Sequence, residues 1–291
     1  MNIAFRLSLS DEPERRIAPS ILQKRRHMQA SLLTELGKLP EYRELIANFT
    51  LREIKAKYKQ AFLGVSWALI QPIVLMAMLT VVFSYFARIP SDGVPYPLFL
   101  FTALLPWQYF SSALNRGTGS LVNQAALITK IYFPRESLVL ASLAAALVDF
   151  AITAIVFVAM LVYYQMAPTL TWLWVVPVFL IQTVLSLGLM LYLAPLNAMY
   201  RDVGQAIPLA IQVWMYATPI MYPASLVPDN IRPYYFLNPM AVIIESYRSA
   251  MLRNQMPNLP LLALAAAFAI VLLASGYLVF KRLESRIADV A

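Results

Sequence analysis

Residues 50–87 read TLREIKAKYKQAFLGVSWALIQPIVLMAMLTVVFSYFA, a basic segment that leads without interruption into a long apolar one. Thr50, followed three residues later by Glu53, matches a capping box, which satisfies free backbone donors at a helix start. The 28 residues from Gln60 to Ala87 carry no charge, and a helix of that length measures about 42 Å, more than the ~30 Å hydrocarbon core. The stretch therefore predicts a membrane-spanning helix whose basic end faces the cytoplasm.

The composition of the whole chain also favours a membrane protein. Of the 291 residues, 60% are hydrophobic, and there is no cysteine, which excludes disulfides and thiolate metal sites. The net charge of +8 does not indicate nucleic acid, because twelve of the 23 Lys and Arg lie in residues 1–60 and most others lie in short loops. That distribution is typical of a basic rim at a membrane surface. Residues 1–20 mix charges of both signs without a long apolar core, so we expect an uncleaved signal-anchor rather than a signal peptide.

Six apolar runs predict an all-α integral membrane protein with six transmembrane helices. The chain then divides into a cytoplasmic N-terminal tail (1–40), a membrane domain (41–280) and a cytoplasmic C-terminal tail (281–291). Nineteen of the 23 Lys and Arg fall in the segments expected on the cytoplasmic side, which agrees with the positive-inside rule. The expected spans are 60–87, 93–115, 137–164, 171–196, 203–222 and 259–280.

An N-terminal amphipathic helix is expected before the first span. Its apolar residues share one helical face, whereas after Thr50 the apolar positions rotate by about half a turn. One straight helix cannot present both stripes to the same surface. We therefore expect a helix lying on the membrane, a break near Asn48–Thr50, and a second helix that enters the bilayer. The first stripe consists of Tyr42, Leu45, Ile46 and Phe49.

The segment 223–258, between the last two spans, is too long for a turn and too charged to span the membrane. Asn238 before Pro239 is the pattern of a helix N-cap followed by proline in the first turn. We expect one or two short re-entrant helices that dip into the outer leaflet, where protein or water satisfies their backbone.

Motifs for enzymatic chemistry are largely missing. The single histidine, His27, lies in the N-terminal tail, so a membrane hydrolase that needs histidine would have none within the spans. No GxxxxGK[ST] phosphate-binding loop occurs, so any ATP that drives the protein must be bound by another polypeptide. The chain is therefore not expected to be an enzyme, nor to hold a cofactor or a metal.

Asp149 is the only ionisable residue well inside a predicted span. An intramembrane acid suggests an ion or proton site, but an acid without a membrane-buried His, Lys or Arg is a poor proton relay. The alternative interpretation is a structural acid that hydrogen-bonds to Ser, Thr or Tyr of a neighbouring helix.

Aromatic residues gather at the ends of the spans, where an interfacial belt is expected. Some of them could instead line a passage in which sugars stack on the rings, and the sequence does not choose between these interpretations. The candidates for a passage are Trp67, Tyr85, Phe86, Trp107 and Tyr109.

The loop between the second and third spans reads NQAALITKIYFPRE (123–136). It is expected on the cytoplasmic side, with a helical stretch followed by an apolar and aromatic knob. Exposure of Ile131, Tyr132 and Phe133 to water would be unfavourable unless another surface covers them. They are expected to lie on lipid or to form a docking site for a soluble partner.

Four of these pieces resemble the membrane subunits of bacterial ABC transporters that export lipid-linked polysaccharide, such as O-antigen, capsule and teichoic acid. The resemblance covers about residues 40–280, with the spans in matching order, and leaves the first 40 residues uncovered. The four pieces are KYKQAFLGVSWALIQP (57–72), Leu105-Pro106-Trp107, the loop Lys130–Glu136 and Leu237-Asn238-Pro239.

The resemblance implies a permease in the bacterial inner membrane. It would be a homodimer that forms a channel for a lipid-linked glycan. Two copies of an ABC ATPase, which hold ATP and Mg, would bind to it. The lipid is typically undecaprenyl diphosphate, the amphipathic helix would guide it, and 223–258 would form an outer gate. The coupling helix that contacts the ATPase would include Lys130, Ile131, Tyr132, Phe133, Pro134, Arg135 and Glu136. Arg52, Lys55, Lys57 and Lys59 would meet the lipid headgroup, and ordinary attraction to anionic lipid is the competing explanation.

Three other functions are compatible with the sequence. The first is an ABC permease for a drug or a different lipid. The second is an ATP-independent transporter or flippase that uses Asp149. The third is a membrane glycosyltransferase or ligase, for which Glu245, Arg248 and Arg253 are the clustered charged residues on the outer side.

Overall fold

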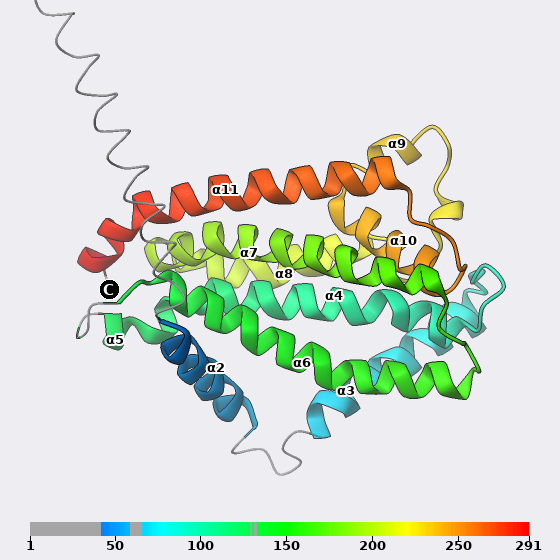
Figure 1. Ribbon diagram of the computed structural model, residues 1–291, viewed down its shortest axis with the longest axis horizontal. Helices are drawn as coiled ribbons and strands as arrows, with labels where there is room; N and C mark the ends of the chain where they lie inside the picture. The colour runs from blue at the N-terminus through cyan, green and yellow to red at the C-terminus, as the bar shows by residue number, and fades with distance from the viewer. Residues whose placement is uncertain (1–41, 59–65, 129, 131–132, 291) are drawn as a thin grey trace, which may run out of the picture. The chain divides into compact units, whose positions relative to one another are not determined.

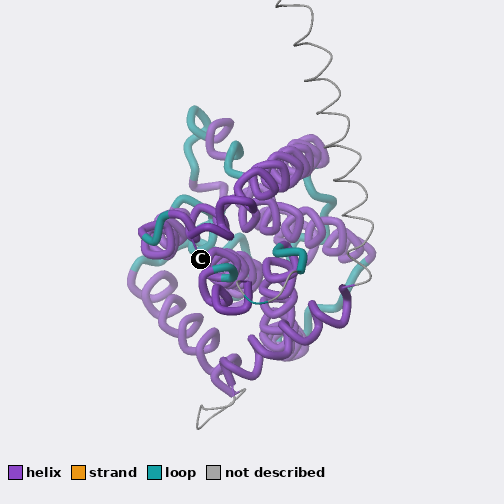
Figure 2. Tube along the Cα trace, turned by 90° about the vertical axis from the view of Figure 1, so that its left-hand side faces the viewer, coloured by secondary structure: helices purple, strands orange, loops and turns teal. Residues whose placement is uncertain are grey.

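The computed structural model describes residues 42–58, 66–128, 130 and 133–290, with the backbone alone for 285–290. Its contacts divide the chain into two units, Met1–Leu45 and Ile46–Ala291, and the second unit is described below. The described residues form helices joined by loops, with no β-strand among them (Figure 1, Figure 2). The fold is therefore all-helical, as the apolar runs predict.

Helix α2 (Arg43–Tyr58) runs without a break through Asn48–Thr50, so the predicted break at that point is wrong. Thr50 is not a cap: its hydroxyl donates to Ile46 O at 2.8 Å, one turn back, and lies 3.4 Å from Ala141 O of α6 (Glu136–Tyr163). Phe49 of the first apolar stripe packs on Phe133. In the following turns, Glu53 and Tyr58 hydrogen-bond to Ser142 and Asp149 of α6.

Helix α4 (Tyr96–Gly119) is the core around which the unit is built. Most of its side chains are buried, and it contacts α3 (Ser66–Thr80), α6, α7 (Val175–Met199), α8 (Asp202–Tyr216) and α10 (Pro239–Met251). Protein covers most of this helix, so its composition need not match lipid. Gln108 and Arg116 are half-buried, whereas Asn115 is exposed.

Helices α7 and α11 (Leu259–Val290) form the most extensive helix pair. Gly188 and Gly276 let the two backbones approach closely: a Cβ added at Gly276 would lie 2.6 Å from Gly188 O, and one at Gly188 would lie 2.8 Å from Leu273 N. Small residues at helix contacts of this kind are the usual means of tight packing in membranes.

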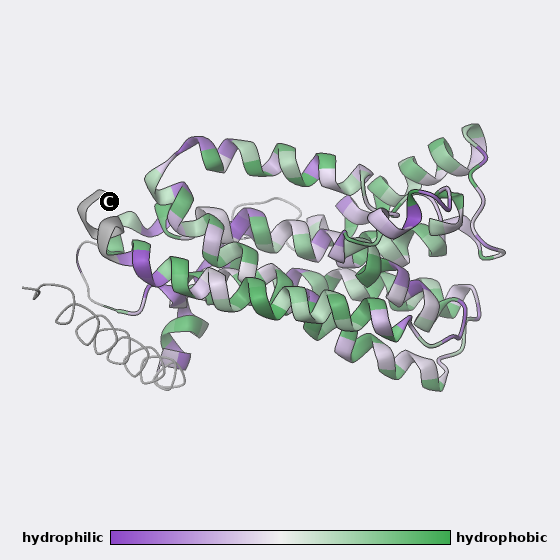
Figure 3. Cartoon of the chain, turned by 90° about the horizontal axis from the view of Figure 1, so that it is seen from above, coloured by the Kyte–Doolittle hydropathy of each residue, from purple (hydrophilic) through white to green (hydrophobic). Residues whose placement is uncertain are grey.

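Four helical stretches among the described residues are long and apolar enough to cross a membrane: Ser66–Phe86, Glu136–Tyr163, Leu170–Met199 and Leu259–Glu284. They correspond to the first, third, fourth and sixth predicted spans. The stretch Ser66–Phe86 includes a π-helical turn, η3 (Val81–Phe86). The stretch Leu170–Met199 begins with a 3₁₀ turn, η5 (Leu170–Trp174). Hydrophilic residues gather toward the ends of the long helices and in the loops (Figure 3).

The second and fifth predicted spans do not meet the same criteria. Helix α4 has 24 residues, enough for ~36 Å at about 1.5 Å per residue, but it is polar in its second half. Helix α8 has 15 residues and measures about 22 Å, which is shorter than the ~30 Å core. The chain continues from α8 through the non-helical residues 217–223.

The segment that follows α8 contains η6 (Ala224–Leu226), α9 (Arg232–Tyr235) and α10. The predicted N-cap is confirmed: the Asn238 side chain accepts from Met240 N at 3.0 Å, and Pro239 occupies the first turn of α10. Helix α10 is buried over most of its length and packs against α4, α7 and α11. It is therefore a core helix of the fold rather than a surface cap.

Candidate functional site

Asp149, in the middle of α6, is held by three side chains from two other helices. One carboxylate oxygen, Oδ2, lies 2.7 Å from Lys57 Nζ of α2 and 2.6 Å from Arg116 Nη2 of α4. The other oxygen accepts from the Tyr58 hydroxyl at 2.6 Å. Burial, and then the hydrogen bond to Asp149, raise the pKa of Tyr58 above its usual range, so this hydroxyl stays a donor. The expectation of an acid without basic partners is wrong.

A second acid completes the cluster. Glu53 of α2 accepts from the Ser142 hydroxyl of α6 at 2.6 Å and lies 3.5 Å from Arg116 Nη1. Ser112 in turn accepts from Arg116 Nε at 3.2 Å. Two carboxylates therefore face two cations, so the cluster is balanced in charge. This arrangement fastens α2 to α4 and α6 and favours a structural acid at Asp149 over a proton relay.

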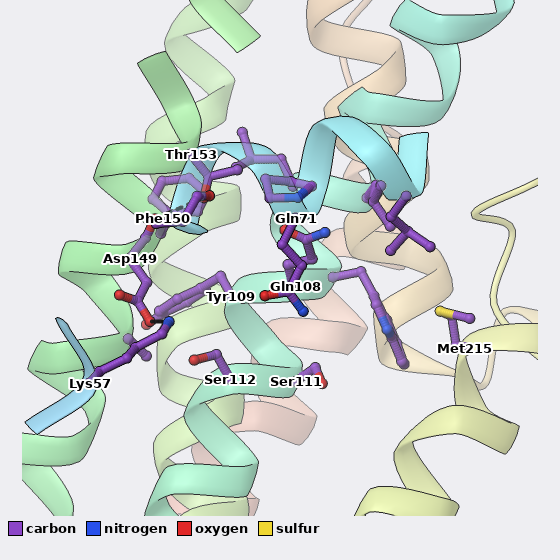
Figure 4. A pocket seen from close by; sticks show the side chains of 17 residues that line it. Lys57, Gln71, Gln108, Tyr109, Ser111, Ser112, Asp149, Phe150, Thr153 and Met215 are labelled. Carbon is purple, nitrogen blue, oxygen red and sulfur yellow. Dashed lines mark hydrogen bonds and ion pairs between the residues drawn. The ribbon is translucent and has the colours of Figure 1, made fainter. Parts of the chain in front are cut away.

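A pocket of about 340 Å³ opens beside this cluster, between α3, α4 and α6 (Figure 4). Lys57 and Asp149 lie at one end of it and Met215 of α8 at the other. Gln71 and Gln108 project into its middle (Figure 4). The remaining polar lining consists of hydroxyl groups, from Tyr109, Ser111, Ser112 and Thr153. Amides and hydroxyls of this kind can bond neutral polar groups such as those of sugars.

The candidate aromatic residues separate into two groups. Trp107 and Tyr109 are 3% and 1% exposed: Trp107 packs with Phe110 and Trp214, and Tyr109 packs with Phe150 and Phe179. Both line the pocket with a small part of their surface. Trp67, Tyr85 and Phe86 are 50%, 76% and 71% exposed, on the outer faces of α3 and η3. A role in sugar stacking stays a prediction for each of them.

Amide side chains reach the surface in three helices of the membrane domain. Within α3, α4 and α8 they reach the surface fully or in part, whereas the two in α7 are buried and α6 and α11 have none. Large apolar side chains are exposed on α6, α7 and α11, among them Ile155 and Leu180, and also on α3 and α8, among them Val74 and Leu209. The amides that reach the surface are Gln71, Gln108, Asn115, Gln205 and Gln212, here called the surface amides. Two of them, Gln71 and Gln108, line the pocket together.

The loop between α4 and α6 is held by the chain itself. It contains η4 (Val122–Gln124) and α5 (Ala125–Ile128). Phe133 is 8% exposed and lies 5.7 Å from the Phe49 ring, so the expectation that it needs another protein or lipid to cover it is wrong. Lys130 is exposed, and Pro134 is half-buried. Ile131 and Tyr132 lie outside the described residues.

The end of this loop is bound to α11. Arg135 donates to Glu284 O, and Glu136, 3% exposed, forms an ion pair with Lys281 Nζ at 2.9 Å. Both side chains therefore have partners in this chain, and any contact of theirs with a second protein has to share them.

The basic residues before the first span do not form one group. Arg52 and Lys55 are exposed, whereas Lys57 is bound to Asp149, and Lys59 lies outside the described residues. Headgroup binding by Arg52, Lys55, Lys57 and Lys59 stays a prediction. Among the residues that the structure describes, no His, Asp and Glu side chains come together in a group that could hold a metal ion.

Sequence reasoning missed several residues of the site. Glu53 was interpreted as part of a helix cap, and Arg116 lies one residue beyond the predicted second span, 93–115. A signal for the pocket was present, because Gln108, Ser112 and Asn115 recur at helical spacing in an otherwise apolar span. Such a stripe indicates a face that lipid does not cover.

Comparison with known proteins places the chain in a family. The ABC-2 type transporter family matches residues 44–252. The chain is 29% identical over 248 residues to the O-antigen export system permease protein RfbA of Klebsiella pneumoniae, covering 85% of this chain and 95% of that protein. It is 30% identical over 255 residues to the RfbA protein of Myxococcus xanthus, with the same coverage. It is 23% identical over 235 residues to the polysialic acid transport protein KpsM of Escherichia coli, covering 80% of this chain and 91% of that protein. The chain is a multi-pass membrane protein that belongs to the ABC-2 type transporter family.

Proposed function

We propose that this protein is the channel-forming membrane subunit of an ATP-driven exporter that moves lipid-linked polysaccharide across the bacterial inner membrane. The names of its relatives, O-antigen export permease and polysialic acid transport protein, support a polysaccharide as the cargo. The resemblance of the sequence favours undecaprenyl diphosphate as the lipid.

The polar lining of the pocket between α3, α4 and α6 is the observation that carries this proposal. An amide group turned toward hydrocarbon loses its hydrogen bonds with water, at a cost of several kcal/mol. Gln71 of α3, Gln108 of α4 and Thr153 of α6 line the same pocket, so its polar lining is not a property of one helix. A water-filled passage for a hydroxyl-rich polymer accounts for that lining, whereas lipid does not.

A homodimer is part of the proposal. A second copy placed against the pocket side of the first would enclose the path on both sides. The proposed topology keeps six crossings, with both termini in the cytoplasm. In this topology α8 crosses together with the loop 217–223, and α10 is re-entrant from the outside.

The ATPase is proposed as a separate protein that docks on the loop between α4 and α6. Lys130 and Asn123 are exposed there, whereas Arg135 and Glu136 contact α11. Lys130→Glu should therefore weaken co-purification with the ATP-binding subunit without disturbing the fold. Arg135→Glu is a poorer test, because it also removes the bond to Glu284 O.

The alternatives draw less support from the same residues. Asp149 is neutralised by Lys57 and Arg116, which disfavours a flippase driven through that acid. Arg248 is buried and donates to backbone carbonyls, and Arg253 pairs with Glu245 and Asp92. A glycosyltransferase would need these groups to be free for a substrate.

Cysteine accessibility tests the proposal, because the natural sequence contains no cysteine. Ser111→Cys and Gln212→Cys should react with a membrane-impermeant thiol reagent in the complex with the ATPase, and nucleotide should change their rates. Val158→Cys is the matched control and should stay unreactive. Val158 is 57% exposed, on the apolar face of α6. Equal protection of all three positions, with polysaccharide export intact, would rule out a passage along the pocket and the surface amides.

A further inference from the structure

A second cavity, of about 580 Å³, lies between the later halves of α3 and α6. It is here called the α3–α6 groove. Its walls are almost entirely apolar, and its polar side chains are Thr80 at one side and two tyrosines at the end of α6. The lining residues used below are Ile73, Met76 and Ala77 of α3, and Val156, Ala159 and Met160 of α6.

Water is a poor occupant of this groove. A buried water needs two to four polar partners, and the interior offers one hydroxyl, Thr80 Oγ1, which is buried and has no hydrogen-bond partner among the described residues. The surrounding surface of α6 exposes Ile155, Val158 and Val162. The groove therefore opens onto an apolar face, where hydrocarbon is the surrounding medium.

The groove continues the line of the polar pocket described above. On α6, Thr153 lines the pocket and Val156 lines the groove, less than one helical turn of about 5.4 Å away. On α3, Pro72 and Leu75 line the pocket while their neighbours Ile73 and Met76 line the groove. The same two helices thus offer hydrogen-bonding groups at mid-depth and an apolar channel from there toward the end of α6.

We propose that the α3–α6 groove binds a hydrocarbon chain of the lipid that carries the glycan while the polar head of that lipid occupies the neighbouring pocket. An amphiphile is the ligand whose two parts match the two cavities. Its orientation is that of a lipid from the cytoplasmic leaflet drawn partway across the membrane, with Tyr163 and Tyr164 at the outer end of the chain. The inference rests on the proposed function and assigns to α3 and α6 the site for the lipid part of the substrate.

Photo-crosslinking in the assembled complex tests this site. The chain and its ATPase are placed in lipid nanodiscs with a diazirine-tailed undecaprenyl-diphosphate glycan, or with a diazirine-tailed phosphatidylethanolamine. Mass spectrometry should find the glycan lipid on residues 156–164, and unlabelled glycan lipid should compete with it. Ala159→Trp, which fills the groove, should lower this labelling by about tenfold, the factor that corresponds to excluding roughly two CH₂ groups. Val158→Trp, on the same turn outside the groove, should leave labelling and export unchanged.

Three outcomes would overturn the inference. They are equal labelling of the groove by phosphatidylethanolamine and glycan lipid, glycan-lipid labels that fall only outside residues 156–164, and full export by Ala159→Trp. The wild-type export rate separates this inference from the proposed function. Export without groove labelling contradicts only the lipid site, whereas a wild-type complex that moves no polysaccharide contradicts the proposed function whatever its labelling.

Discussion

Replacement of Arg248 by methionine should be the most destabilising single change in the outer part of the protein. The guanidinium is fully buried and donates to Pro219 O at 2.5 Å, Ile220 O at 2.7 Å and Tyr222 O at 3.3 Å. It also lies 3.7 Å from the centre of the Phe99 ring. These carbonyls belong to the non-helical segment after α8, which has no other means of satisfying them if lipid or protein surrounds it.

The magnitude follows from those contacts. Each carbonyl left without a partner costs roughly 1–3 kcal/mol, and a desolvated cation–π contact contributes about 2 kcal/mol. Removal of the buried charge returns several kcal/mol of desolvation, so we expect a net loss of about 3 kcal/mol of unfolding free energy. For a protein of this size, that corresponds to a fall in Tm of roughly 6–12 °C.

The assay is thermal unfolding of the detergent-solubilised protein, followed by tryptophan fluorescence. Arg248→Lys should lie between wild type and Arg248→Met, since one ammonium cannot replace the planar fork of donors. Arg201→Met is the control, because Arg201 is exposed just before α8, where a surface substitution usually changes stability by less than about 0.5 kcal/mol. A Tm of Arg248→Met within ~2 °C of wild type would correspond to a loss of less than about 1 kcal/mol of unfolding free energy. That result would refute the reasoning that Arg248 supplies the hydrogen bonds needed by the carbonyls of this segment.

Three further changes test other parts of the structure. Asp149→Asn keeps a hydrogen-bond partner for Tyr58 but removes the carboxylate that Lys57 and Arg116 share. The Tm in detergent should therefore fall while polysaccharide export persists. Loss of export by a variant of normal stability would instead make Asp149 a residue required for transport. Phe133→Ala removes the ring that packs on Phe49 and should cost about 3 kcal/mol of local stability, measured as faster proteolysis of the loop 122–135. Phe49→Ala should give the same rate of proteolysis. Faster cleavage in the double variant than in either single variant would show that the two rings act separately. Gly276→Ala places a Cβ 2.6 Å from Gly188 O and should reduce the yield of folded protein in detergent, whereas Ala274→Val, at an exposed position, should not; an unchanged yield would mean that α7 and α11 can separate without penalty.

The sequence predicts the helices of this fold well where they face lipid, because a helix in lipid needs a long apolar stretch. The spans around α3, α6, α7 and α11 are recognised because each turns a long apolar side outward. Helix α4 does not follow this rule because protein covers most of it, and α8 does not because the helix is only 15 residues long. Local signals such as the Asn238 cap are reliable, since they depend on neighbouring residues alone.

The candidate site was harder to predict because it depends on distant pairs. Asp149 meets Lys57 and Arg116 from 92 and 33 residues away, and no spacing in the sequence encodes such a meeting. Phe133 was misjudged for the same reason, since its cover is Phe49 of α2. The Thr50–Glu53 pattern imitated a helix cap, but both side chains turned out to serve contacts with α6 and α4.

The cluster around Asp149 has a consequence for how the chain enters the membrane during synthesis. A bare carboxylate in the middle of a span opposes insertion by about 2.5–3.5 kcal/mol. Lys57 and Arg116 both precede Asp149 in the chain, so its two counter-charges are already synthesised when α6 leaves the ribosome. We expect α6 to be integrated together with α2 and α4 rather than alone. Removal of both cations should therefore lower the integrated fraction of α6, measured with a reporter fused after Tyr164, and an unchanged fraction would mean that the remaining apolar residues of α6 suffice.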